Sequence, residues 1–338
     1  MFIELKNLKE AGYTIIFISH KLEEVCEICD RITIIRRGET MGVHSICDVT
    51  QEDISRLMVG RDVALSLEKA PPKPGEVTIR VQNLVVRGNE GNNAVDGISF
   101  AARAGEIIGV AGVEGNGQSQ LVEALTGLRS YQEGSIQLLG KEIAGWSIRR
   151  IRGQKVSHIP EDRMSIGVAP NLSITENMLA DKADDIRFSS RLGLMKQASI
   201  RAYGGDMVEQ YGIFTKSPDA PIGSLSGGNI QKAVLARELS SDPQIIIADQ
   251  PTRGVDVGAS EFIRQTLINM RDAGRTIFLV SSDLNEVIGL SDRLMVLFEG
   301  KITAFFSEMD QVTEELLGRY MLGIDRQTTE EVEMAFYE

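Results

Sequence analysis

The sequence predicts an α/β fold in which short buried strands alternate with helices, and three observations lead to that prediction. An apolar run at Ile107–Ala111 is followed by a glycine-rich turn and a helix-forming stretch. A second apolar run, within Gln244–Asp249, ends in a carboxylate. The stretch Thr276–Val287 begins with a third run and continues as a turn and a helix. Such runs, bounded by turn residues and followed by helical periodicity, are typical of a sheet covered by helices.

Composition indicates a folded chain of one large or two medium domains. The 338 residues are 42% hydrophobic, and the formal net charge is −12 at pH 7. An acidic chain is poorly suited to binding a phosphate backbone, so we expect no nucleic-acid partner. No apolar run approaches the roughly 20 residues that a membrane-spanning helix needs. The N-terminal residues 1–12 have the pattern of a charged amphipathic helix, without a signal-peptide core.

The cysteines are Cys26, Cys29 and Cys47, and the first two form a C-x-x-C pair. Such a pair can be redox-active or supply half of a zinc site. The sequence contains no second pair, and Leu22–Asp30 has the pattern of an amphipathic helix. We therefore interpret the pair as ordinary positions on a helix face. The low cysteine content fits a reducing compartment.

The two ends of the chain resemble each other. Thr14–Val25 matches Thr276–Val287, and Asp30-Arg31 matches Asp292-Arg293. A match of this length indicates duplicated domains. A long α/β pattern precedes the second copy, whereas almost nothing precedes the first. We therefore expect residues 1–64 to be the C-terminal remnant of a first domain whose body is missing.

Within the remnant, Thr14–Ser19 has the composition of a buried strand, whose missing neighbours would leave its hydrogen-bonding edges open.

A linker separates the remnant from the rest of the chain. Three prolines and a glycine within residues 65–76 predict a stiff, extended linker. We expect the complete domain at residues 77–307, with a helical subdomain at about residues 165–240, and an acidic helix or tail at residues 308–338.

The turn Gly112–Ser119 fits a phosphate-binding loop at every fixed position except one. Its glycines permit a tight turn whose backbone N–H groups face an anion, and the following helix N-terminus adds partial positive charge. Ser119 stands where a hydroxyl would bind Mg²⁺, but Gln118 replaces the lysine that brings a full charge to the phosphates. Alone, the pattern also fits a dinucleotide-binding turn or an ordinary strand–helix turn. The loop residues predicted to bind a ligand are Gly112, Gly115, Asn116, Gly117, Gln118, Ser119 and Gln120.

A second anion site is predicted at the start of a later helix. Small residues at a helix N-terminus favour anions, and the helix that follows carries its apolar positions on one face. The apolar run ending at Asp249 comes next, and a carboxylate there can hold magnesium, usually through water. The predicted residues of this second site are Leu225, Ser226, Gly227 and Gly228.

The order of these motifs resembles the ATP-binding cassette (ABC) family, and the resemblance covers essentially the whole chain. It implies a cassette with a mixed core sheet, an antiparallel β subdomain and a helical subdomain, preceded by the remnant of a first cassette. It also implies ATP and Mg²⁺ as cofactors, with Asp249 at the magnesium-associated position. Glu161 occupies the position of the family's γ-phosphate-sensing glutamine, and Asp256 matches the D-loop aspartate.

Three positions depart from the family's pattern. Gln250 stands where the family has the glutamate that orients the attacking water, and Ser282 replaces the switch histidine, which the first copy keeps as His20. Glutamine can hydrogen-bond water but cannot take its proton. Together with Gln118, these substitutions predict a cassette that binds ATP rather than cleaving it. An ordinary ATPase with unusual residues remains the alternative.

The resemblance also implies partners. Cassettes of this family dimerise head to tail, with each ATP between the glycine loop of one and the L-S-G-G stretch of the other. The sequences of the motifs are most similar to those of the fused two-cassette subunits of nucleoside and simple-sugar importers. Glu261-Phe262-Ile263 favours the nucleoside branch. This implies permease subunits, an extracytoplasmic solute-binding protein, and a peripheral location on the cytoplasmic face of the membrane. We expect Ser173–Ala180 to face the permease, while the absence of an aromatic residue in Asn83–Asn93 weakens the expected contact with adenine.

Two other classes of protein fit parts of the pattern. A non-catalytic regulatory cassette would share the substitutions at Gln118, Gln250 and Ser282. A soluble cassette protein acting on ribosomes or DNA would be expected to keep its catalytic glutamates and to carry a basic surface or a long charged linker, which this sequence lacks.

Overall fold

The structure is a computed structural model, and the part of the chain that it describes comprises residues 2–19, 22–36, 38–60, 69–190 and 193–337. The chain divides into two compact units, which are residues 1–66 with 254–262, and residues 67–253 with 263–338. Among the described residues, no helix has both the length and the apolar character that crossing a bilayer requires.

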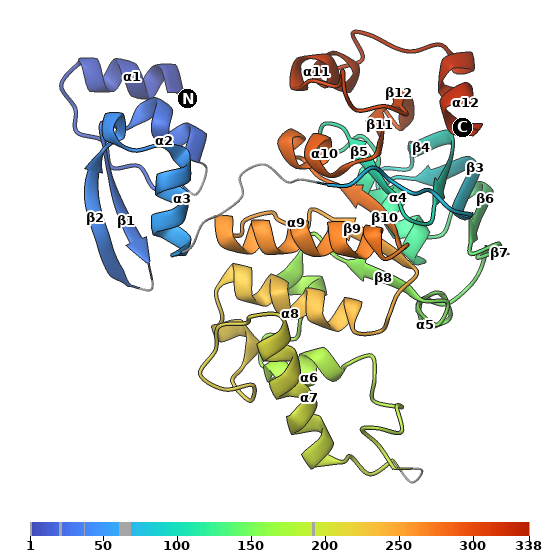
Figure 1. Cartoon of the computed structure of the whole chain (residues 1–338). Helices are drawn as coiled ribbons and strands as arrows, with labels where there is room; N and C mark the ends of the chain where they lie inside the picture. The colour runs from blue at the N-terminus through green and yellow to red at the C-terminus, as the bar shows by residue number, and fades with distance from the viewer. Residues whose placement is uncertain (1, 20–21, 37, 61–68, 191–192, 338) are drawn as a thin grey trace. The chain divides into compact units, whose positions relative to one another are not determined.

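The first unit contains a β-hairpin with helices packed on it (Figure 1). Its elements are α1 (Phe2–Glu10), α2 (Leu22–Ile28), β1 (Arg31–Arg36), β2 (Glu39–Ser45), a 3-10 helix (Ile46–Asp48) and α3 (Gln51–Val59). The two strands pair antiparallel, and Leu22, Ile34 and Ile54 form a small core that Cys26 joins. Cys26 and Cys29 are both free thiols. Cys26 therefore occupies an apolar position on a helix, as the sequence indicated.

A six-stranded mixed sheet forms the centre of the second unit, in the order β12–β11–β5–β10–β9–β8. Its strands are β5 (Ile107–Ala111), β8 (Val156–Ile159), β9 (Ile245–Asp249), β10 (Thr276–Val280), β11 (Arg293–Phe298) and β12 (Lys301–Phe306). Neighbouring strands are parallel except β11 and β12, which form an antiparallel hairpin. Every residue of β5, β9 and β10 is buried, which explains why these strands are continuous apolar runs.

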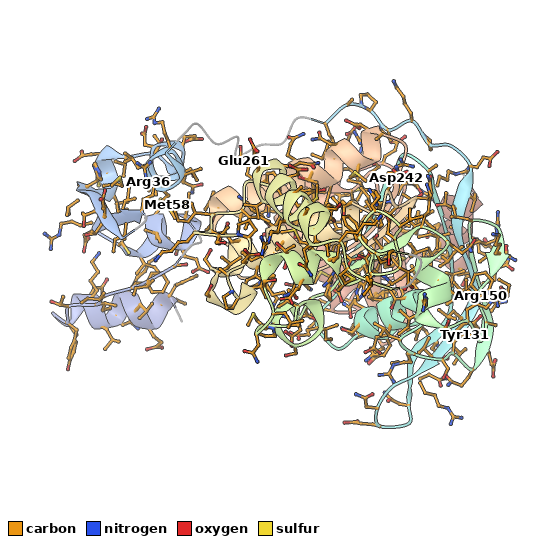
Figure 2. All side chains as sticks on the ribbon, turned by 90° about the horizontal axis from the view of Figure 1, so that it is seen from below. Arg36, Met58, Tyr131, Arg150, Asp242 and Glu261 are labelled. Atoms are coloured by element: carbon orange, nitrogen blue, oxygen red, sulfur yellow. The ribbon has the colours of Figure 1, made fainter. Side chains whose placement is uncertain are left out.

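A separate antiparallel sheet, in the order β4–β3–β6–β7, packs against the mixed sheet. Its strands are β3 (Val77–Arg87), β4 (Asn93–Arg103), β6 (Glu133–Leu138) and β7 (Lys141–Glu142). The rings of Phe100 and Phe278 stack between the two sheets with centroids 5.5 Å apart. Tyr131 and Arg150 lie at one end of the unit (Figure 2), where the Tyr131 hydroxyl donates to Glu142 at 2.6 Å. The antiparallel β subdomain predicted from the sequence is confirmed.

Helices surround these sheets, and α6, α7 and α8 gather in a helical subdomain (Figure 1). The helices are α4 (Gln118–Thr126), α5 (Ile148–Arg152), a π-helix (Arg163–Gly167), α6 (Ile174–Leu179), α7 (Gln197–Gln210), a 3-10 helix (Ile222–Ser224), α8 (Gly227–Leu239), α9 (Val257–Asp272), α10 (Leu284–Leu290), α11 (Glu314–Met321) and α12 (Thr329–Tyr337). Most side chains of α6 are buried. The stretch Ser173–Ala180 therefore offers a partner little more than Glu176 and Ala180.

The linker before the second unit's sheets and the tail after them both form hydrogen bonds with this unit. The linker residue Lys69 donates to the carbonyl of Leu290 at 3.0 Å and pairs with Asp292 at 3.2 Å. In the C-terminal tail, the side chain of Gln327 accepts from the backbone of Phe305 at 2.8 Å. The described parts of the linker and the tail thus belong to the packed structure of this unit.

The strand expected at Thr14–Ser19 is not formed. Residues 13–19 have no regular secondary structure, and the side chains of Ile16 and Ile18 are 90% and 94% exposed. The matching strand β10 is buried because β5 and β9 pair with its two edges. The expectation was wrong because a buried parallel strand needs such neighbours, and the described residues of the first unit provide only the β1–β2 hairpin.

The duplicated segments allow a direct test of the difference in burial between residues 13–19 and β10. Ile16 matches Phe278, which is fully buried in β10. We expect Ile16→Ala to change the free energy of unfolding by less than about 0.5 kcal/mol. Phe278→Ala should cost about 3–5 kcal/mol because it leaves a cavity between the sheets. Urea unfolding followed by circular dichroism measures both, and a large loss for Ile16→Ala would show that the segment is packed in solution.

Candidate functional site

A hollow opens where β5, β9 and β10 end. Because these neighbouring strands are parallel and in register, the segments that follow them meet at one edge of the sheet. Predicted loop residues that line the hollow are Gly112, Gly115, Gln118 and Ser119. The other predicted residues that line it are Glu161, Asp249, Gln250 and Ser282. The structure thus brings together half of the residues that the sequence predicted for the site.

The glycine loop joins β5 to α4 in the predicted strand–loop–helix order. Gly117 precedes the first residue of α4 with φ 105°, and a Cβ atom there would lie 2.2 Å from the carbonyl oxygen of Ala94. Gly115 has φ 94° and faces open space. The missing side chain of Gly117 makes room for a neighbouring strand, and that of Gly115 leaves the loop open toward the hollow.

Asn116 holds the loop in place. Its side-chain N–H donates to the carbonyl of Val113 at 3.0 Å, and its side-chain oxygen accepts from the backbone of Glu299 at 2.7 Å. Its own carbonyl accepts from the backbone of Gly300 at 3.2 Å. The turn between β11 and β12 therefore supports the loop, a contact that no local sequence pattern revealed.

Gln118 turns back into its own loop. Its amide donates to the carbonyl of Val113 at 3.1 Å, and a Cβ atom on Gly112 would lie 2.2 Å from the same amide nitrogen. The side chain is 8% exposed. A neutral amide in this position steadies the loop but brings no formal charge to an anion in the hollow.

Asp249 is a buried carboxylate at the end of β9. It is 7% exposed, and burial, aided by the charge of Glu123, raises its pKa to about 7. Within the described part of the chain, no donor reaches its carboxylate. A buried carboxylate without a partner is costly, so this residue is suited to a cation.

The donors of the hollow fit magnesium better than zinc or calcium. The described residues contain no cluster of three or more His, Cys, Asp or Glu that could enclose a metal ion. The hydroxyl of Ser119 and the carboxylate of Asp249 line the same hollow. Mg²⁺ commonly uses one or two such protein oxygens and takes its remaining ligands from phosphate and water.

Gln250 and Ser282 are hydrogen-bonded to each other. The backbone N–H and the hydroxyl of Ser282 both donate to the side-chain oxygen of Gln250, each at 3.0 Å. Because a backbone N–H can only donate, it fixes which end of the amide is oxygen. Gln250 itself has φ 48°, an uncommon conformation for a residue with a side chain. The acceptor of Gln250 is thus occupied, and its remaining polar group is an NH₂ donor.

Glu161 does not face the hollow as a free carboxylate, because Arg253 forms an ion pair with it. Arg163 in turn donates to the backbone carbonyl of Arg253 at 2.6 Å. Sequence reasoning missed Arg253, which lines the hollow and is its cationic side chain. Its position three residues beyond Gln250, in the loop after β9, was the available signal.

The second predicted anion site lies outside this hollow. Leu225, Ser226, Gly227 and Gly228 are not among the residues that line it. Ser226 precedes the first turn of α8 and is exposed, and its hydroxyl accepts from the side chain of Asn229 at 2.9 Å. The structure therefore leaves this helix start open to another molecule.

Two further predicted residues, Gln120 and Asp256, are not among the described residues that line the hollow. Gln120 is half-buried in the first turn of α4 and does not line it. Asp256 accepts from the backbone of Ala259 at 2.9 Å and so helps to start α9. His20 lies outside the described residues.

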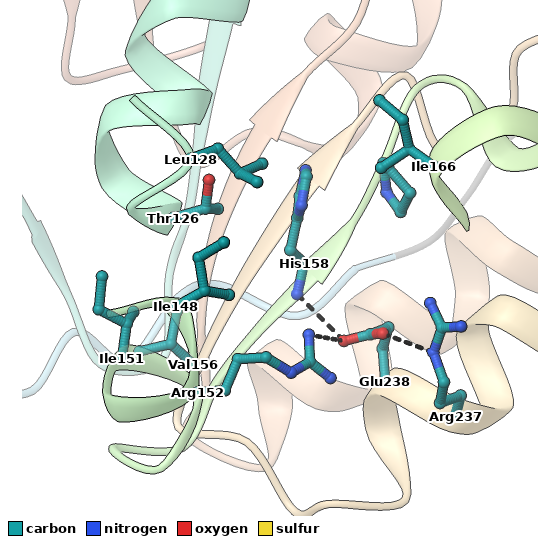
Figure 3. Close-up of a pocket in the computed structure, with 11 residues that line it drawn as sticks. Thr126, Leu128, Ile148, Ile151, Arg152, Val156, His158, Ile166, Arg237 and Glu238 are labelled. Atoms are coloured by element: carbon teal, nitrogen blue, oxygen red, sulfur yellow. Dashed lines mark hydrogen bonds and ion pairs between the residues drawn. The ribbon is translucent and has the colours of Figure 1, made fainter. Parts of the chain in front are cut away.

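A second and more apolar hollow, of about 200 Å³, lies between the core and the helical subdomain (Figure 3). Glu238 forms part of its lining and pairs with Arg152 and Arg237, each at 2.9 Å. The ring of His158 lies between Leu128 and Ile166 (Figure 3). Burial lowers the pKa of His158 to about 4. Within the described part of the chain, its Nε2 atom is buried without a hydrogen-bond partner.

The rim of this second hollow is exposed and apolar. The side chains of Leu128, Ile148 and Ile166 line it and are 48%, 43% and 66% exposed. Met164, two residues before Ile166 in the same π-helix, is 41% exposed. A cluster of exposed apolar side chains around a hollow is typical of a surface that binds another protein.

Comparison with known proteins places these features in a family. Residues 95–253 match the family described as "ABC transporter". The nucleoside import ATP-binding protein NupA of Lactococcus lactis subsp. cremoris is 39% identical over 319 residues, which cover 94% of this chain and 63% of that protein. The guanosine import ATP-binding protein NupO of Bacillus subtilis is 40% identical over 94% of this chain and 62% of that protein. The ribose import ATP-binding protein RbsA of Geobacillus kaustophilus is 35% identical over 96% of this chain and 64% of that protein.

Solved structures agree on the fold. A nucleotide-free ATP-binding cassette from an ABC transporter superposes with a TM-score of 0.60 at 22% identity, covering 77% of this chain and 98% of that one. A bacterial ABC transporter cassette solved as a dimer gives a TM-score of 0.58 at 23% identity, covering 67% and 97%. The chain spans about three fifths of the length of the curated relatives it matches. Residues 95–253 thus carry an ABC transporter domain, and the second unit has the fold of an ATP-binding cassette.

Proposed function

We propose that this chain is the ATP-binding component of an importer for nucleosides or simple sugars, and that its cassette binds MgATP with little hydrolysis. The observation that carries the second part is the Ser282–Gln250 pair. The first part is supported by relatives whose names describe nucleoside, guanosine, ribose and glucose import. The similarity extends over nearly the whole of this chain.

The hollow beside the glycine loop is the proposed site for the triphosphate. The backbone of the loop and the N-terminus of α4 face it, and both favour an anion. Ser119 and Asp249 would hold Mg²⁺, which would neutralise part of the phosphate charge. Affinity would therefore come from backbone dipoles and the metal, because Gln118 brings no charge.

Little hydrolysis follows from the state of Gln250. A general base must accept a proton from the attacking water. The oxygen of Gln250 already accepts two hydrogen bonds from Ser282, and its NH₂ can only donate. The residue can therefore orient a water molecule but cannot activate it.

The proposed location is the cytoplasmic face of the membrane, in contact with permease subunits that serve an extracytoplasmic solute-binding protein. The apolar rim at Leu128, Ile148 and Ile166 is the surface that we propose binds the permease. Head-to-tail pairing with another cassette would bring the exposed helix start at Ser226 to a second nucleotide. A solved relative of this fold is a dimer, which supports such pairing.

A regulatory cassette without transport is the second candidate. The neutral side chains of Gln118 and Gln250 favour the regulatory cassette as much as the importer subunit, because both candidates require nucleotide binding without turnover. The two differ in whether a permease binds the chain, so the co-purification experiment below separates them.

Turnover tests the catalytic part of the proposal. We expect the purified chain to bind MgATP but to hydrolyse it at less than about 1 s⁻¹, the low end for working enzymes. Gln250→Glu should raise the rate about tenfold or more, because one carboxylate oxygen keeps the Ser282 bonds while the other can accept a proton. Gln250→Ala is the control and should stay at the wild-type rate. Wild-type turnover at or above about 1 s⁻¹ that Ser226→Arg abolishes would contradict the proposal.

The role of Asp249 is tested by magnesium dependence. Asp249→Asn should weaken binding of a fluorescent ATP analogue about tenfold or more in the presence of Mg²⁺, with no change in EDTA. Glu114 is the matched control because its carboxylate lines the same hollow. Glu114→Gln should keep the full magnesium effect, and an equal loss in both variants would refute a specific role for Asp249.

Co-purification tests the permease surface. Ile166→Glu should abolish recovery of the chain with the permease subunits of a nucleoside importer, because it places a charge on the apolar rim. Ile186 is 65% exposed and lies outside the second hollow, so Ile186→Glu should leave recovery unchanged. If both variants are recovered as well as the wild type, this surface does not bind the permease.

A further inference from the structure

Glu286 is a buried carboxylate beneath the proposed nucleotide site. It lies in the first turn of α10 and is 1% exposed. One of its oxygens accepts from the hydroxyl of Ser281 at 2.7 Å. The other accepts from the hydroxyl of Thr252 at 2.8 Å and from Arg264 Nε at 3.2 Å. Glu286 does not line the hollow, so it cannot be one of the groups that contact a ligand there.

The two hydroxyl partners of Glu286 come from the loops after β9 and β10, which form the end of the hollow. Ser281 directly precedes Ser282, whose two hydrogen bonds hold Gln250. Thr252 lies two residues beyond Gln250, in the loop after β9. One carboxylate therefore ties the loop after β9 to the loop after β10. Hydrogen bonds to a buried charge are stronger than neutral ones, so this connection is firm.

Arg264 completes the connection. Its guanidinium on α9 pairs with Glu286 at 3.2 Å and with Asp283 at 3.0 Å. Asp283 in turn accepts from the backbone of Glu286 at 3.2 Å and so caps the start of α10. The cluster thus fixes the first turn of α10 and, through its N-cap residue Asp283, the position of the adjacent Ser282.

The first unit contains the same hydrogen bond in its matching segment. The hydroxyl of Ser19 donates to Glu24 at 2.9 Å, and these residues match Ser281 and Glu286 in the internal repeat. The Ser–Glu bond therefore belongs to the duplicated turn itself. In the second unit, Thr252 and Arg264 extend it to the loop after Gln250.

We propose that Glu286 is a positioning residue that sets the separation of Ser282 and Gln250, and thereby the preference of the site for a nucleoside triphosphate over the diphosphate. This inference rests on the proposed function, with the terminal phosphate of a bound triphosphate taken to lie beside Gln250 and Ser282. We expect a diphosphate not to extend to that end of the hollow, so that its affinity depends on the glycine loop and Mg²⁺ alone.

The test compares Glu286→Gln with Glu24→Gln in the full chain. Glutamine has the shape of glutamate, but its NH₂ cannot accept, so Ser281 or Thr252 loses its acceptor. We expect Glu286→Gln to weaken MgATP binding about tenfold or more, the range for losing hydrogen bonds to a charged group, while MgADP affinity stays within about twofold of the wild type. Glu24→Gln, the matched control, should change neither affinity. Isothermal titration calorimetry with MgATP and MgADP measures both affinities for the wild type and for each variant.

Each outcome has a separate meaning. Equal losses of MgATP and MgADP affinity, or no loss of either, would overturn the positioning role and leave the proposed nucleotide site standing. A wild-type chain that binds neither nucleotide would overturn the proposed function itself. If Glu286→Gln fails to fold, Thr252→Val removes one donor while the carboxylate keeps its other partners, and it should still reduce MgATP affinity selectively. An unselective effect of Thr252→Val would likewise overturn the inference.

Discussion

The parallel register of β5, β10 and β9 is the constraint on which the site depends. Val110, Val280 and Asp249 lie at one level of the sheet. The chain leaves each strand at this level, so the glycine loop, the Ser281–Asp283 turn and Gln250 enter the same space. The strands are buried on every residue, and shifting any one of them would place polar residues in the core. Burial of three apolar runs thus determines the geometry of polar groups that contribute little to the core themselves.

The hollow combines a buried acid with neutral side chains. Asp249 carries a raised pKa because it is buried without a donor. The amide nitrogen of Gln118 and the amide oxygen of Gln250 are hydrogen-bonded within the loops. The carboxylate of Glu161 is neutralised by Arg253. A negatively charged ligand would therefore meet backbone N–H groups and a helix N-terminus, and would need a cation beside Asp249. This balance supports the proposal that the cassette binds a nucleotide with little cleavage.

Much of the site could be predicted from the sequence because its residues directly follow apolar runs. Asp249 and Gln250 end one run and Ser282 follows another, so local spacing was sufficient to place them. The support of Asn116 by Glu299 and the partners of Glu286 could not be predicted, because these contacts join segments far apart in the chain. The Thr14–Ser19 strand was wrongly predicted for a related reason. Its composition is that of a buried strand, but its conformation depends on neighbours that local sequence does not describe.

The Ser282–Gln250 pair also has an evolutionary consequence. Ser282 holds the side-chain oxygen of Gln250 where a carboxylate oxygen of glutamate would accept the same two donors. The codons for glutamine and glutamate differ only in their first base, and the surrounding backbone would not have to move. Under the proposed function, a change of one base could therefore convert a cassette that holds a nucleotide into one with a carboxylate placed to accept a proton from water.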